Sequence, residues 1–368
     1  MSAEQLTNEQ TPLVRRAWER CVGCLLPLSL TSTSKPSSDS LRAVSERHFR
    51  RFIYDRYTES QRHYHTLEHL EEMLAQLVAY ETEHGWQGAY IPAMVEETVA
   101  ASVPPPELLT GPERVAYEWT GTVLLLSVLF HDVVYDPTRG DNEEASAAVA
   151  AEFLQTMQRE GSDTSNFTST PLTAAAASLS VADPSALPSA SGTTGAEGDV
   201  NQKYPPSFSS TPKLLWSDAQ AIEFVRNSTT TYILKTKEHL SVEPKQCLHL
   251  PASPASSTSV EREMSSVMQQ SRDDPLHVFL DLDLSILGHP DADTYRYRYA
   301  DNIQREYSHY PRADFLKGRI GFLNGFAQHP QWYKTPYFFY RLEARARHNV
   351  AQEVKALTIE LADVQLAS

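Results

Sequence analysis

The chain has 368 residues, of which 41% are hydrophobic and 21% are charged. This composition allows a sizeable core and excludes a wholly disordered chain. The 32 basic and 47 acidic residues give a formal net charge of −15, which excludes the basic surface that non-specific binding to nucleic acids or anionic membranes requires.

No segment is typical of a membrane span or a signal peptide. The longest apolar run, 121–130, has about half the length of a membrane-spanning helix. Residues 1–13 are polar and lack the basic-then-apolar order of a signal peptide. Three cysteines cannot build a disulfide framework. We therefore predict a soluble, cytoplasmic protein that does not associate with membranes.

Hydrophobic residues recur at helical spacing along most of the chain. The spacing predicts helices over 40–57, 65–83, 113–134, 142 to about 160, 215–240, 291–307, 313–328 and 337 to about 363. The helix over 113–134 is apolar almost all round in its second half, which is typical of a central buried helix. No segment shows sustained two-residue alternation. We predict an all-α fold with at least eight helices around one core.

Low-complexity stretches interrupt this pattern. Of the 52 residues in 161–212, 36 are Ser, Thr, Ala, Pro or Gly and five are charged, so the stretch cannot bury enough apolar surface to fold. Stretches 31–40 and 251–274 are similar, and we expect all three to be disordered. This predicts an N-terminal helix and linker (1–40), an interrupted helical domain (41–357) and a C-terminal tail (358–368).

Two histidine motifs carry possible chemistry. His65 and His69 are four residues apart, so on a helix they share one face and can reach a common metal or substrate group. His131 and Asp132 close the most apolar helix, where a charged group must be paired or metal-bound. A simpler interpretation of the first motif is a pair of exposed histidines on a helix. For the second motif, it is a turn that begins at Asp132, with His131 hydrogen-bonded to a backbone carbonyl.

A later apolar stretch holds two carboxylates, Asp281 and Asp283. On a helix they point about 200° apart, so both cannot face one site; Asp281 can instead be an N-cap. His239 follows at the end of a predicted helix, where the helix dipole favours a histidine without any function.

The ordered set resembles the HD superfamily of metal-dependent phosphohydrolases, whose fingerprint is His … His-Asp … Asp, and within it a subfamily of uncharacterised predicted HD phosphohydrolases. The resemblance runs from Trp18 to about Leu357. It rests on the motifs Arg62-His63-Tyr64-His65 with His69, Phe130-His131-Asp132 with Tyr135-Asp136, Asn142-Glu143 with Ser146-Ala147, Thr236 with His239, Leu280-Asp281 to Gly288, Arg305-Glu306-Tyr307, Gly318-Arg319, and Ala344-Arg345-Ala346 with Asn349.

The resemblance implies an HD-like helical bundle and a set of metal ligands: His69, His131, Asp132 and Asp283, with Asp281 as the alternative aspartate. His65 lies where the related cyclic-nucleotide phosphodiesterases carry the histidine that protonates the leaving group, although Thr66 replaces their asparagine. Val133 to Asp136 lack a further histidine that those enzymes have, which argues against cyclic-nucleotide specificity.

Two imidazoles and two carboxylates suit Mn²⁺, Fe²⁺, Zn²⁺ or Mg²⁺, any of which can activate water for attack on a phosphate. We expect His65 or His239 to act as general acid, and Arg62, Lys237, Arg305 and Arg319 to bind phosphate. The predicted activity is hydrolysis of a phosphorylated small molecule, with a nucleotide as the leading candidate. The alternatives are a non-catalytic HD-fold regulatory module that binds metal or nucleotide, and a structural helical scaffold.

Overall fold

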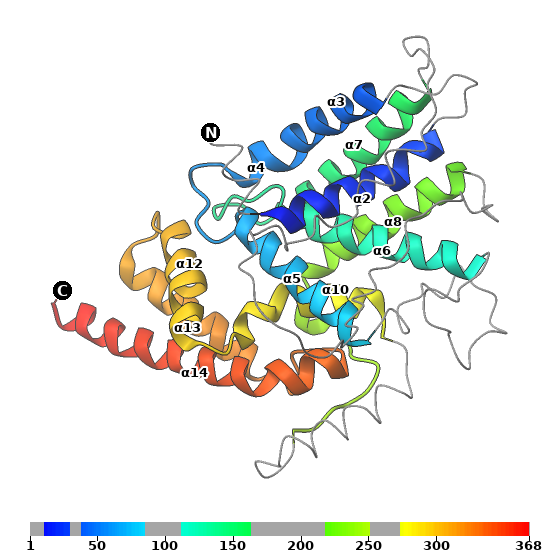
Figure 1. The fold of residues 1–368 in the computed structure, drawn as a ribbon. Coiled ribbons are helices and arrows are strands. Elements are labelled where there is room, and N and C mark those ends of the chain that lie inside the picture. The colour runs from blue at the N-terminus through cyan, green and yellow to red at the C-terminus, as the bar shows by residue number, and fades with distance from the viewer. Residues whose placement is uncertain (1–10, 30–37, 85–111, 163–217, 251–272, 368) are drawn as a thin grey trace, which may run out of the picture.

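The computed structural model describes residues 11–29, 38–84, 112–162, 218–250 and 273–367, and every regular element among them is a helix (Figure 1). The predicted all-α class is confirmed. The stretches predicted to be disordered lie almost wholly outside the described residues. Only their edges are described: 38–40 begin a helix, 161–162 end one, and 273–274 precede one.

The chain winds through a succession of helices. In the first half these are α2 (Pro12–Ser29), α3 (Ser38–Phe49), the π-helical turn η1 (Arg50–Tyr54), α4 (Asp55–Tyr57), α5 (Leu67–His84), α6 (Pro112–Phe130) and α7 (Asn142–Ser162). In the second half they are α8 (Asp218–Thr236), η8 (His239–Ser241), α10 (Pro275–Asp283), η9 (Leu284–Gly288), α11 (Ala292–Thr294), the π-helical turn η10 (Tyr295–Ala300), α12 (Asp301–Glu306), α13 (Arg312–Ala327) and α14 (Pro336–Ala367).

Helix α6 is the central buried helix, as predicted. Every residue from Trp119 to its end at Phe130 is buried, because its apolar side chains point in all directions and neighbours cover every face. The ring of Phe130 stacks on Phe153 of α7 with the centroids 5.2 Å apart, and Phe153 in turn lies 5.0 Å from Trp18 of α2. Helix α2 therefore contributes to the same core as the rest of the bundle.

The C-terminal helix is longer than predicted. Helix α14 continues without a break to Ala367, so the predicted tail 358–368 is helical as far as that residue. Within the described parts of the chain, none of the helices has the length and apolar character needed to cross a membrane.

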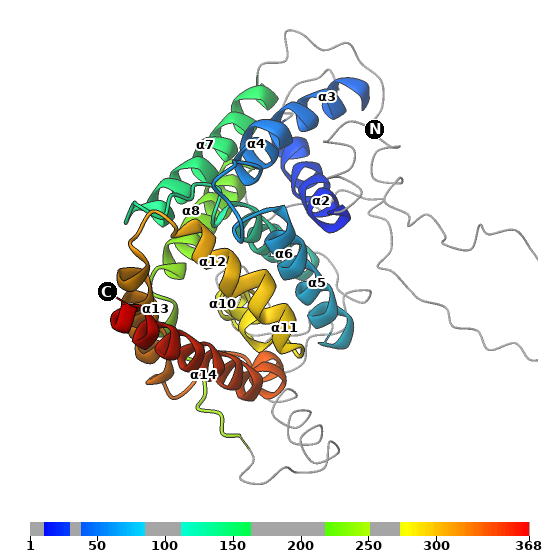
Figure 2. The same cartoon turned by 90° about the vertical axis from the view of Figure 1, so that its left-hand side faces the viewer.

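Three helix ends meet in the middle of the molecule. Helix α10 packs against both α5 and α6, which lie side by side in Figure 2. The first turn of α5, the residues after α6 and the last residue of α10 are thereby brought together, although they come from distant parts of the chain. These ends carry the histidines and carboxylates that the sequence singles out.

Candidate metal centre

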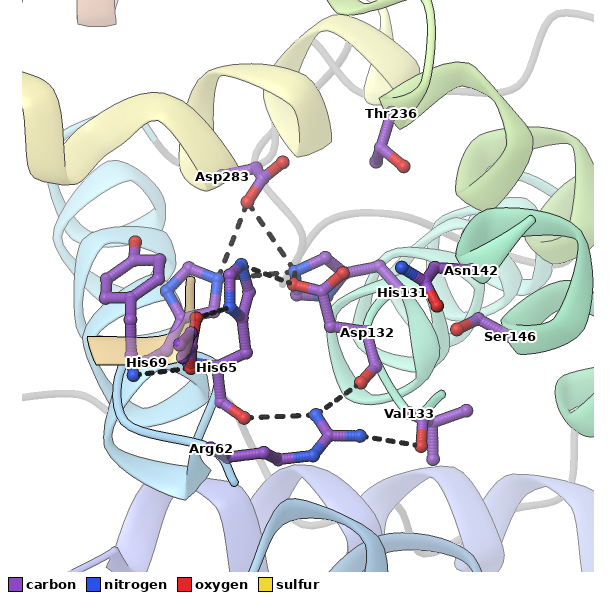
Figure 3. Close-up of polar contacts among 12 residues, drawn as sticks. Arg62, His65, His69, His131, Asp132, Val133, Asn142, Ser146, Thr236 and Asp283 are labelled. Carbon is purple, nitrogen blue, oxygen red and sulfur yellow. Dashed lines mark hydrogen bonds and ion pairs between the residues drawn. The ribbon is translucent and has the colours of Figure 1, made fainter. Parts of the chain in front are cut away.

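His69, His131 and Asp283 form a compact cluster of possible metal ligands (Figure 3). Each offers one ligand atom, and these atoms all lie within 4.8 Å of one another. The two Nε2 atoms are 3.3 Å apart, and each is 3.5 Å from Oδ1 of Asp283. Both histidines are buried, whereas the Asp283 side chain is 22% exposed, so the cluster is open to solvent on the carboxylate side.

The orientation of His131 suits a metal ligand. Its Nδ1 lies 2.9 Å from the carbonyl oxygen of Val128, which can only accept a hydrogen bond, so Nδ1 carries the proton. The neutral ring then directs the lone pair of Nε2 toward the cluster. A backbone carbonyl that fixes the tautomer in this way is a common partner of metal-binding histidines.

Asp132 lies at the edge of this cluster. Its Oδ2 is 2.9 Å from Nε2 of His131 and 3.9 Å from Nε2 of His65. It therefore connects the three-residue cluster to His65. Three of the four expected ligands therefore form the cluster, and Asp132 contacts it through His131.

His65 is held by a carboxylate from a distant helix. Oε2 of Glu306 lies 2.7 Å from its Nδ1, and Oε1 of Glu306 accepts the backbone N–H groups of residues 63–65 at 2.7–3.1 Å. The ring of Tyr135 stacks on the imidazole with the centroids 3.8 Å apart. Nε2 is thus left on the side of Asp132, at the edge of the cluster. Glu306 and Tyr135 were not predicted as site residues; both occur in the motifs of the family resemblance.

The charges of the cluster favour a cation. Burial raises the pKa of Asp132, but His131 and His65 outweigh it and lower this pKa to about 2. Burial also opposes ionisation of Asp283, yet contact with His131 and His69 holds its pKa well below the usual range. For His131, burial lowers the pKa, and the two carboxylates raise it well above the ordinary value. The site therefore stabilises positive charge, which a divalent cation can supply instead of a proton.

The two aspartates of α10 have different surroundings. Asp281 is fully buried and accepts hydrogen bonds from the backbone N–H groups of Lys334 and Thr335, at 2.6 and 2.8 Å, and from the Thr335 hydroxyl at 2.8 Å. These bonds fix the start of α14. Asp283, and not the alternative Asp281, is the aspartate that faces the histidines.

His239 lies behind Asp283. Its Nε2 donates to the carbonyl of Leu280 at 2.7 Å, and its Nδ1 is 3.7 Å from Oδ2 of Asp283. Burial lowers the pKa of His239 to about 4, although Asp283 opposes this shift. A histidine that is neutral at pH 7 and bonded to the backbone is poorly suited to the predicted general-acid role, and His65 is the better candidate.

Arg62 has a structural environment and not the phosphate-binding one we expected. Its side chain is fully buried, and four of its five N–H groups donate hydrogen bonds; Figure 3 shows the three bonds to backbone carbonyls. Nη1 donates to the carbonyls of His65 and Asp132 at 3.0 and 2.7 Å, Nη2 to that of Val133 at 3.1 Å, and Nε to Glu59 at 3.2 Å. Arg62 thereby ties the two histidine motifs together and cannot reach a substrate.

We expect Arg62→Met to destabilise the fold by about 3 kcal/mol or more, because it leaves three carbonyl groups without their donor, each costing about 1–3 kcal/mol. Chemical denaturation measures the change. The control is Arg56→Met, since Arg56 is exposed on α4 and its replacement should change stability by less than about 0.5 kcal/mol. Equal stability of the two variants would contradict this role.

The other three predicted phosphate-binding residues differ in their hydrogen-bond and ion-pair partners. Lys237 is exposed and donates to Glu144 at 2.7 Å, and Arg319 is paired with Glu353 at 2.8 Å. Arg305 is exposed, and its one hydrogen bond within the described residues is to the side chain of Asn302 in the same helix. Of the predicted phosphate-binding residues, Arg305 therefore has most of its donors available.

The loop after the His-Asp pair is fixed by side chains of α7. The Asn142 amide bonds to both the N–H and the carbonyl of Asp136, at 3.0 and 2.9 Å. The Ser146 hydroxyl does the same for Val134, at 3.0 and 3.2 Å. In the sequence Asn142 and Ser146 stand out only as part of the family pattern; in the structure they hold the backbone that follows His131 and Asp132.

The chain matches no family model, no curated protein and no solved structure. The HD resemblance therefore stays a prediction that rests on the motifs themselves.

Proposed function

We propose that this chain is a metal-dependent phosphohydrolase of the HD type. The observation that carries the proposal is the partly exposed cluster of His69, His131 and Asp283, which come from three distant segments, with Asp132 in contact with His131. Their spacing in the sequence does not by itself bring these residues together. Their nitrogen and oxygen donors fit Mn²⁺, Fe²⁺, Zn²⁺ or Mg²⁺, and none of them is a thiolate that would require a softer metal.

The protein side chains have separate roles in this proposal. The four clustered residues would hold the cation, which when bound supplies Lewis-acid chemistry toward water and phosphoryl oxygens. His65 is 15% exposed at the edge of the cluster, where its Nε2 can give a proton to the leaving oxygen. Glu306 fixes the orientation of the His65 ring because its buried carboxylate accepts a hydrogen bond from Nδ1.

The test is an assay of phosphate release from nucleotides and sugar phosphates. Protein stripped with a chelator is reloaded with each of the four metals, beside an Asp132→Ala variant. We expect release to require metal and to fall at least about 10²-fold in the variant. Release that survives both chelation and the substitution would overturn the proposal. Metal binding without release from any substrate would favour the non-catalytic regulatory module.

A further inference from the structure

The two histidines of the cluster are held in different ways. The carbonyl of Val128 fixes the ring of His131 through Nδ1. Among the residues that the structure describes, the hydrogen bond and the ion pair of His69 both involve its Nε2, and none reaches its Nδ1. A metal-binding histidine is almost always held through its second ring nitrogen. The imidazole of His69 must therefore be held by the side chains packed around it.

Tyr64 packs against this imidazole. The ring centroids of Tyr64 and His69 are 4.7 Å apart, with the planes tilted by 42°. Tyr64 is 7% exposed, and its backbone N–H donates to Glu306 at 2.8 Å. The ring of Tyr299 in turn packs against that of Tyr64 at nearly a right angle, with the centroids 4.9 Å apart. Tyr299 thus reaches His69 through one intervening ring.

Tyr299 lies in the π-helical turn η10, which is tied to helices on two sides. Its neighbour Arg298 is 3.0 Å from Glu72 of α5, the helix that carries His69. The guanidinium of Arg319 lies 5.0 Å from the centroid of the Tyr299 ring, within the range of a cation–π attraction. Arg319 is paired with Glu353 of α14, and both side chains are less than a tenth exposed. Single π-helical turns are frequent at functional sites.

We propose that Tyr299 is a positioning residue of the metal centre, which holds the imidazole of His69 through Tyr64 so that Nε2 faces the cluster. This inference rests on the metal-binding part of the proposed function. A ligand whose ring is already packed in place loses little freedom when the cation binds, so the packing raises metal affinity. In this arrangement Arg319 supports Tyr299 instead of binding phosphate.

The dissociation constant for Mn²⁺ tests the proposal, measured by calorimetry on the full chain after chelator treatment. Tyr299→Ala should raise it by about 10–100-fold, the usual effect of losing a residue behind a ligand. Tyr299→Leu, which keeps most of the side-chain volume, should show the same loss. Tyr299→Phe should stay within about threefold of the wild type, because the contacts with Tyr64 and Arg319 need only the ring.

The imidazole C–H signals of His69 in nuclear magnetic resonance spectra of the metal-free protein report its orientation directly. They are assigned with His69→Gln. We expect these signals to shift in Tyr299→Ala and Tyr299→Leu and to stay in place in Tyr299→Phe. A purely structural role of Tyr299 would not produce this pattern.

Phe326→Ala is the matched control, because it removes a buried ring of α13 that packs on Trp332 with the centroids 4.6 Å apart. It should lower the thermal midpoint and leave both the Mn²⁺ affinity and the His69 signals unchanged. Unchanged affinity in Tyr299→Leu, an equal loss in Phe326→Ala, or no Mn²⁺ binding by the wild type would overturn the positioning role. The expected losses of affinity, without phosphate release from any compound, would instead reject the hydrolase function and leave the positioning role standing.

Discussion

Asp283→Asn should strip the metal centre of its cation, whereas Asp281→Asn should leave the metal content unchanged and weaken the fold. Among the residues that the structure describes, Asp283 is the one carboxylate grouped with both His69 and His131. Replacing a ligand should lower metal affinity by more than about 10²-fold, since even the loss of a residue behind a ligand lowers it 10–100-fold. Metal analysis of the purified protein measures the difference.

The two substitutions control for each other because they change the same side chain two residues apart on one helix. Asp281→Asn turns an acceptor of three hydrogen bonds into a group that can satisfy only part of them, which should cost about 2–4 kcal/mol. Thermal unfolding of the metal-free variants therefore separates a structural role from a ligand role. Metal loss on changing Asp281, with metal retained on changing Asp283, would reverse the assignment.

The fold class was predictable because it depends on local properties. The spacing of apolar residues alone indicates helices, and the all-round apolar character of residues 119–130 alone indicates a buried helix. The meeting of His131 with a carboxylate was predictable for a different reason, since a His-Asp pair at the end of such a helix needs a partner. What the sequence left open was which of Asp281 and Asp283 faces that pair.

The interpretation of the basic residues depends on partners remote in the chain. The sequence predicts that Arg62 binds phosphate. In the structure Arg62 instead donates to the carbonyl groups of Asp132 and Val133, which lie 70 and 71 residues away in the chain. Glu306 lies 241 residues from His65, so no spacing rule connects them. Whether a charged side chain points inward is decided by tertiary contacts, which helical periodicity does not report.

Glu306 also makes stability depend on pH. Burial raises its pKa, but the His65 side chain and the backbone N–H groups of His63 and His65 outweigh this and lower it to about 2. The ionised form of Glu306 is therefore more stable in the native state than in the unfolded chain. The resulting stabilisation, about 3 kcal/mol, is fully present above pH 5 and is lost as the pH falls toward 2.

His65→Ala should keep the metal and lower turnover by about 10²–10⁴-fold, the usual contribution of a general acid. His69→Ala should lose both metal and turnover. A ligand supplies metal affinity in the ground state, whereas an acid acts only as the leaving oxygen gains charge. Aryl phosphates need little protonation of their leaving group, so the His65 defect should shrink on them while the His69 defect persists.

Glu306→Gln extends this test to the residue that holds the acid. Its amide can still accept the N–H groups of residues 63–65, but it replaces the carboxylate that contacts Nδ1 of His65 with a neutral group. Turnover should fall by about 10–10²-fold with metal content unchanged, and the defect should again shrink on aryl phosphates. Metal loss in His65→Ala equal to that in His69→Ala would make His65 a ligand. An undiminished Glu306→Gln defect on aryl phosphates, with metal retained, would show that Glu306 serves substrate binding and not proton transfer.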